Sequence, residues 1–112
     1  MLLSTRKGTT FNLHEWIFTG FRTQLEELIV PDNYIEDLSR LRKTDDGEKI
    51  TLKKIDFTRN KIQTLSYDDF MDLPEGTEVI IKENPINADA TALQKFKDGL
   101  DFSGVQAKFI WE

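Results

Sequence analysis

The stretch L-E-E-L-I-V-P-D-N-Y-I-E-D-L at residues 25–38 is followed by a second copy, L-K-K-I-D-F-T-R-N-K-I-Q-T-L, at residues 52–65. Five apolar positions coincide in the two copies, and Asn33 aligns with Asn60 at the same offset of 27 residues; the apolar pairs are Leu25/Leu52, Leu28/Ile55, Val30/Phe57, Ile35/Ile62 and Leu38/Leu65. A third copy, G-T-E-V-I-I-K-E-N-P-I, begins at residue 76 and places Asn84 at an offset of 24, with Gly76 where the first leucine should be. The chain therefore contains three copies of one pattern, which we call the first, second and third repeats.

Each repeat predicts a short strand that ends in a turn. Apolar residues at 28 and 30, at 55 and 57, and at 79 and 81 alternate with a period of two, as in a half-buried strand. Asparagine tolerates turn geometry, and its side-chain amide can both donate to and accept from backbone groups. We therefore expect stacked copies to form a ladder of structural amides, Asn33–Asn60–Asn84.

The pattern L-x-x-L-x-L-x-x-N-x-L, read over residues 25–86, strongly resembles a leucine-rich repeat protein. The resemblance implies an α/β leucine-rich repeat solenoid with a short parallel sheet, an N-terminal helical cap and a C-terminal cap of helix and strand. One domain is expected over residues 1–112. It comprises an N-terminal cap or degenerate repeat (1–24), three repeats (25–87) and a C-terminal cap (88–112), without the cysteine caps of some family members.

Segments outside the strands also carry a pattern. In the second repeat, Leu65, Phe70 and Leu73 are expected to point inward from the returning segment, and the polar residues 42–49 to form a solvated loop. Residues 16–25 are either the end of a degenerate first repeat or a capping helix that begins near residue 12. A helix is predicted from the N-cap Asp89 to a stop at Gly99. Leu93, Phe96 and Leu100 form the apolar face of this helix. A final strand is predicted after it, with one side formed by Val105, Ala107, Phe109 and Trp111.

In leucine-rich repeat proteins the residues between the strand leucines face the concave, usually ligand-binding side. The resemblance implies that this side exposes Glu26, Glu27, Ile29, Pro31 and Asp32; Lys53, Lys54, Asp56, Thr58 and Arg59; and Thr77, Glu78, Ile80, Lys82 and Glu83. In neighbouring parallel strands these residues form the columns Glu27–Lys54–Glu78 and Asp32–Arg59–Glu83, in which the signs alternate. One interpretation is that the charges compensate one another and have only a structural role.

The other interpretation is an interaction patch. Between the two charged columns lies a central column, Ile29–Asp56–Ile80, in which the two isoleucines flank the aspartate. Apolar residues surrounded by charged ones are typical of interaction patches. The expected partner-binding residues are Ile29, Pro31, Lys54, Asp56, Thr58, Arg59, Ile80 and Lys82. A terminal segment that folds over the face would cover the isoleucines instead.

Composition excludes several classes of protein. The 112 residues include no cysteine and one histidine, and 15 basic against 20 acidic residues give a net charge of −5. Thiol nucleophiles, disulfides, Cys-based zinc sites and multi-histidine metal sites are therefore excluded. The acidic balance argues against direct nucleic-acid binding. No apolar run approaches the roughly 20 residues that span a bilayer, and the N-terminal residues do not resemble a signal peptide.

The sequence carries no catalytic constellation. His14 has no nucleophile beside it, the acidic turn at Asp68, Asp69 and Asp72 has no cleft, and the D-D-G-E run at 45–48 lacks the ligand spacing of a calcium loop. We therefore expect a cytoplasmic, non-enzymatic protein–protein interaction module with no cofactor or metal and no membrane contact. Two alternatives stay open: a small acidic inhibitor or decoy that occupies a basic, nucleic-acid-binding surface, and a self-associating subunit or fragment of a larger repeat assembly.

Overall fold

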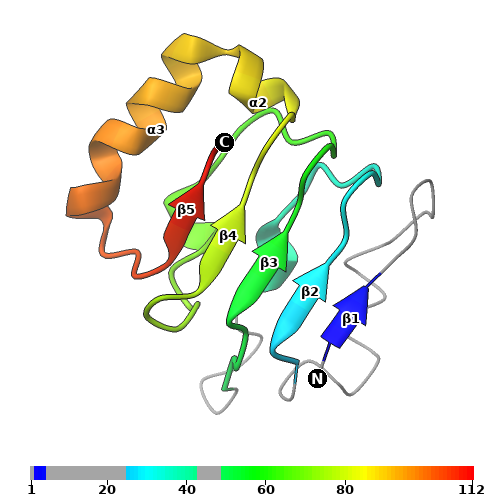
Figure 1. Cartoon of the computed structure of the whole chain (residues 1–112). Coiled ribbons are helices and arrows are strands. Elements are labelled where there is room, and N and C mark those ends of the chain that lie inside the picture. The colour runs from blue at the N-terminus through cyan, green and yellow to red at the C-terminus, as the bar shows by residue number, and fades with distance from the viewer. Residues whose placement is uncertain (1, 5–24, 43–48) are drawn as a thin grey trace.

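The computed structural model describes residues 2–4, 25–42 and 49–112, and in these residues five short parallel strands form one sheet (Figure 1). The strands are paired in chain order and are β1 (Leu2–Ser4), β2 (Glu27–Ile29), β3 (Lys54–Asp56), β4 (Glu78–Ile80) and β5 (Lys108–Ile110). The other elements are the 3₁₀ turns η2 (Ser39–Leu41) and η3 (Tyr67–Asp69) and the helices α2 (Pro85–Ala88) and α3 (Ala90–Ser103). The predicted α/β class with a short parallel sheet is confirmed.

The N-terminal segment was expected to be a helical cap or a degenerate repeat. Only residues 2–4 of it are described, and they form the strand β1, which pairs in parallel with β2. The remainder of the predicted cap lies outside the described residues, as do His14 and the acidic run at 45–48.

The register confirms that the three strands occupy equivalent places in the three repeats. Leu28 pairs with Ile55, Ile55 with Val79, and Val79 with Phe109. Paired residues are 27, 24 and 30 positions apart in these three steps, and β1 precedes β2 by 25 positions. The length of chain between strands therefore varies while the register is kept.

The core lies on one face of the sheet, between the strands and the returning segments. Leu28, Ile55 and Val79 at the strand centres are fully buried, as are the next inward residues of each repeat, Val30, Phe57 and Ile81. From the returning segments come Leu38, Leu41, Ile62, Phe70, Leu73 and Ile86, all buried, and Leu65 packs against the same core. The turns η2 and η3 lie behind the sheet in Figure 1, so this face is covered.

The predicted amide ladder is present, and it connects successive repeats. The Nδ2 of Asn60 donates to the carbonyl of Val30 in the first repeat (3.0 Å), and its Oδ1 accepts from the Ile35 N–H (3.2 Å). Asn84 stands in the same relation to the second repeat, where it donates to the Phe57 carbonyl (2.9 Å) and accepts from two N–H groups of residues 60 and 62. All three asparagines of the ladder are at most 4% exposed, so they satisfy backbone groups that water does not reach.

An ion pair joins the two returning segments. Arg42 donates from Nε (3.0 Å) and Nη2 (2.9 Å) to Oδ1 of Asp69, which lies 27 residues later and therefore at the equivalent place in the second repeat. Burial raises the pKa of the Asp69 carboxyl, and the attraction of Arg42 offsets this only in part.

The C-terminal segment forms the predicted helix and strand, but the predicted end of the helix is wrong. Asp89 accepts from the Ala92 N–H (3.1 Å) as the N-cap, whereas α3 continues through Gly99 to Ser103. It ends at Gly104, whose φ of 87° is the left-handed conformation that favours glycine at a helix C-terminus. Gly99 serves a different purpose, because a Cβ at this position would clash with the hydroxyl of Tyr67, which donates to the Phe96 carbonyl (2.9 Å).

The helix and β5 meet in an aromatic cluster. The ring of Phe96, the buried residue of α3, makes edge-on contacts with Phe70, Phe109 and Trp111 at centroid distances of 6.2, 5.5 and 6.0 Å. Leu93 and Leu100 of the predicted helix face, and Val105 and Ala107 before β5, pack against the same core. This segment therefore closes the hydrophobic core at the β5 end of the sheet.

Candidate functional site

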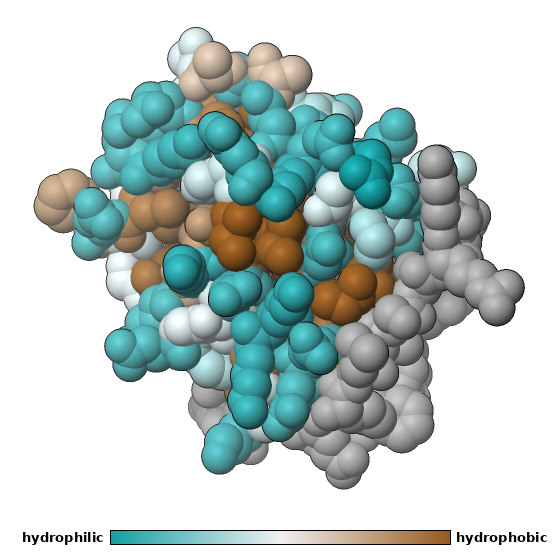
Figure 2. Space-filling model, viewed as in Figure 1, coloured by the Kyte–Doolittle hydropathy of each residue, from teal (hydrophilic) through white to brown (hydrophobic). Residues whose placement is uncertain are grey.

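The second face of the sheet is not covered by the returning segments, and we call it the open face. Because side chains alternate along a strand, the first and last residues of β2 to β5 point to this face: Glu27 and Ile29, Lys54 and Asp56, Glu78 and Ile80, and Lys108 and Ile110. All but the exposed Lys108 are partly exposed. Figure 2 shows hydrophobic surface over β2 and over β4 and β5, with hydrophilic surface around and between them.

The central column of the open face contains the isoleucines. The register places Ile29 beside Asp56, Asp56 beside Ile80 and Ile80 beside Ile110. The predicted flanking of Asp56 by two isoleucines is confirmed, and a third isoleucine extends the column. Ile110 and Lys108 were not among the predicted open-face residues, although the alternation that assigns Phe109 to the core requires both of its neighbours to face the other way.

Asp56 is held in one orientation by the next turn of its own repeat. Its Oδ1 accepts from the N–H of Thr58 (2.9 Å) and from the Thr58 hydroxyl (2.6 Å). Thr58 is only 9% exposed, so the prediction that it is exposed on this face is wrong. Its side chain instead lies beneath the surface and holds Asp56 in place. Thr77 is also buried, contrary to the prediction, because its hydroxyl donates to the carbonyl of Leu52 (2.7 Å).

The two charged columns differ in their ion pairs. In the column Asp32–Arg59–Glu83, Arg59 donates from Nε to Oδ1 of Asp32 (2.6 Å) and from Nη1 to Oε2 of Glu83 (2.7 Å), so these charges compensate one another. The hydrogen bond to Asp32, followed by that to Glu83, raises the pKa of the Arg59 guanidinium and keeps it charged. The compensating interpretation is confirmed for this column.

The same three residues share an unusual backbone conformation. The φ angles of Asp32, Arg59 and Glu83 are 57°, 55° and 54°, which is the left-handed region that residues other than glycine rarely adopt. Each of them immediately precedes a ladder asparagine, so the tight turn that positions the amide is the same in all three repeats.

In the other charged column, which begins at Glu27, the register aligns Glu27, Lys54, Glu78 and Lys108, with alternating signs. No ion pair within 4.0 Å joins these four side chains in the part of the chain that the structure describes. Their charges are therefore available to a partner, in contrast to those around Arg59.

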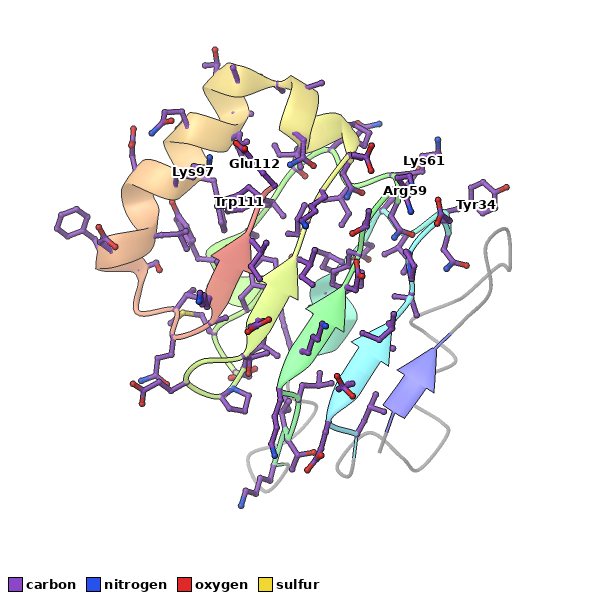
Figure 3. The ribbon with its side chains drawn as sticks, viewed as in Figure 1. Tyr34, Arg59, Lys61, Lys97, Trp111 and Glu112 are labelled. Atoms are coloured by element: carbon purple, nitrogen blue, oxygen red, sulfur yellow. The ribbon has the colours of Figure 1, made fainter. Side chains whose placement is uncertain are left out.

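The remaining predicted residues lie at the carboxyl ends of the strands. Pro31 and Lys82 are partly exposed, and the described residues offer the ammonium of Lys82 no ion-pair partner. Beyond the turns, Figure 3 shows Tyr34 and Lys61 near Arg59 at one end of the sheet. The side chain of Tyr34 is 61% exposed. At the β5 edge of the sheet the ammonium of Lys97 lies 5.5 Å from the ring centre of Trp111, which supports the aromatic cluster.

The described residues contain no group of three or more His, Asp or Glu side chains placed to hold a metal ion. Within the same residues, none of the helices has both the length and the apolar character that crossing a membrane requires. No known family model, curated protein or solved structure matches this chain.

Proposed function

We propose that the chain is a leucine-rich repeat domain. Three observations support this assignment: strands paired in parallel and in chain order, separations of 24 to 30 residues between paired positions, and buried asparagines that bridge successive repeats. Each repeat alone exposes most of its apolar residues, and stacking buries them in one continuous core. On this proposal, α3 and β5 act as the C-terminal cap.

On the same proposal the domain is a non-enzymatic module that binds a protein partner through the open face. The observation that carries this function is the column of partly exposed isoleucines, Ile29, Ile80 and Ile110, next to charged side chains that form no ion pair with one another among the described residues. Apolar residues that a partner can bury supply affinity, at roughly 25 cal/mol per Å² of apolar surface removed from water. The surrounding charges supply orientation and specificity.

The charge of the open face favours this function over the acidic decoy. Across the strand and turn positions of β2 to β4, six acidic and four basic residues give a net charge of −2, and Lys108 and Glu112 at the equivalent positions around β5 cancel each other. A decoy for a nucleic-acid-binding surface requires a strong excess of negative charge, because its affinity is electrostatic. The open face has little excess to offer.

The test is affinity capture from the source cell with the complete chain and with the double variant Ile29→Asp/Ile80→Asp. We expect a specific protein to be captured by the wild type and lost by the double variant. Phe102→Asp is the matched control, because Phe102 is 91% exposed on α3 and lies outside the open face. Circular dichroism establishes that each variant is folded. Equal capture by the wild type and the folded double variant would refute the open face as the binding surface.

A further inference from the structure

The order of residues in the central column indicates the chemistry of the partner, if the open face is the binding surface proposed above. Across the sheet the column reads isoleucine, aspartate, isoleucine, isoleucine, from β2 to β5. A partner that buries the three isoleucines also covers Asp56, which lies between two of them. The question is therefore what group of the partner meets this carboxylate.

One of the two carboxylate oxygens of Asp56 already accepts hydrogen bonds, which fix the side chain in position. Its Oδ1 accepts two hydrogen bonds from Thr58, whereas its Oδ2 accepts none from the described residues. Lys54, two residues earlier on the same strand, forms no ion pair with it within 4.0 Å. Burying an ionised carboxylate without a partner is costly, and a hydrogen-bonded cation is the group that best offsets this cost. A lysine or arginine of the partner at this point offsets that cost most fully.

The spacing of the column indicates the secondary structure that carries this cation. Neighbouring strands lie about 4.8 Å apart, so the three steps from Ile29 to Ile110 cover about 14 Å. In an α-helix the residues on one face, three or four apart, are separated by about 5.3 Å along the axis, and ten residues cover about 15 Å. An extended strand has same-face residues about 6.7 Å apart, so three steps cover about 20 Å and its side chains lose register with the column. A helix that crosses the strands matches the column, and an extended peptide does not.

We propose that the open face binds an amphipathic helix of a protein partner whose apolar stripe is interrupted by one lysine or arginine. The basic side chain pairs with Asp56, and apolar side chains contact Ile29 on one side and Ile80 and Ile110 on the other. When such a helix runs from β2 to β5, its sequence has an apolar residue and then a basic residue three or four positions later. Two further apolar residues follow, about 7 and 11 positions after the first apolar residue. A helix that runs in the opposite direction has the reverse order, in which the basic residue is the third of the four.

The proposal is tested by selection with the complete chain as bait. Two probes are used: a displayed three-helix protein with one randomised helix face, and a displayed library of linear random 12-residue peptides. We expect the helical library to yield binders with lysine or arginine between apolar residues at helical spacing. Binders that have apolar residues at alternate positions, binders without a basic preference, or no enriched binder at all would overturn the proposal.

Removal and reversal of the charge at Asp56 then test the pairing itself. We expect Asp56→Asn to weaken the selected helices by about 30-fold or more, because truncating one partner of a buried charge pair costs at least that much. Asp56→Lys should instead select helices with glutamate or aspartate at the central position. The matched control is Asp68→Asn, which removes the same charge from η3 on the other side of the sheet and should leave affinity unchanged. Unaltered binding by folded Asp56→Asn would overturn the pairing.

The two proposals fail in different ways. If folded Ile29→Asp/Ile80→Asp still binds the selected helices and still captures the cellular protein, the open face is not the binding surface. If that variant loses binding while Asp56→Asn and Asp56→Lys behave as the wild type, the open face is the binding surface and the basic helix is wrong. Thr58→Val keeps the volume of Thr58 but removes its hydroxyl. It should weaken the preference for a central basic residue without abolishing apolar binding.

Discussion

Replacing Asn84 with alanine tests how much of the stability depends on the amide ladder. The Asn84 side chain is 4% exposed, and its Oδ1 accepts the backbone N–H groups of Asn60 (3.0 Å) and Ile62 (3.2 Å). Its Nδ2 donates to the carbonyls of Phe57 (2.9 Å) and Lys82 (3.0 Å), but both of these carbonyls have a second donor. The substitution therefore leaves two buried N–H groups without an acceptor.

The cost follows from those two groups. An unsatisfied buried donor costs about 1–3 kcal/mol, so we expect Asn84→Ala to lower the free energy of unfolding by about 4 kcal/mol. This is a large fraction of the roughly 5–15 kcal/mol that stabilises a domain of this size. Urea unfolding, followed by tryptophan fluorescence and circular dichroism, measures the loss as a lower midpoint with an unchanged m-value.

Asn60→Ala is the matched comparison. The three carbonyls that the Asn60 Nδ2 contacts all keep another donor, and only the N–H of Ile35 loses its acceptor. We expect this variant to lose about 1–3 kcal/mol, clearly less than Asn84→Ala. If the two variants are equally stable, or if Asn84→Ala costs less than 1 kcal/mol, counting orphaned donors does not explain the role of the ladder.

Two further outcomes concern the returning segments and α3. Gly99→Ala should destabilise the protein by about 1–3 kcal/mol, because the new Cβ clashes with the Tyr67 side chain. In a Tyr67→Ala background the same substitution should stabilise the protein by about 1 kcal/mol, because alanine has a higher helix propensity than glycine. A double-mutant cycle followed by thermal unfolding measures both effects. Burial raises the pKa of Asp69, so its contribution to stability is fully present below the ordinary value of 3.8 and is lost as the pH rises through the raised pKa. Wild type should therefore gain stability relative to Asp69→Asn as the pH falls through that interval, and an opposite slope in pH-dependent urea midpoints would contradict the assignment.

The sequence was sufficient to predict the strands of the three repeats and much of the open face. Two independent signals coincide in each repeat: the period of two that assigns Leu28, Ile55 and Val79 to the core, and the asparagine that follows five residues later. Because the register of parallel strands aligns equivalent positions, the columns across the open face followed from alignment of the copies alone.

Other features depend on tertiary contacts that the local pattern does not contain. The sequence pattern did not predict β1, because the residue 25 positions before Asn33 in the sequence is a glycine and no asparagine marks a repeat there. Helix α3 passes through Gly99 because Tyr67, 32 residues earlier, packs against that glycine. Thr58 and Thr77 were assigned to the surface by position, whereas their hydroxyls find buried acceptors.

The unequal separations between paired strand residues have a consequence for how such a chain tolerates insertions and deletions. The strands and the asparagine turns have the same form in each repeat, and the separations of 24, 27 and 30 residues are absorbed by the returning segments. Residues can therefore be gained or lost behind the sheet without shifting Ile29, Asp56 or Ile80 out of line. The returning side and the open face are free to diverge separately, so variation in length on one side leaves the recognition chemistry of the other intact.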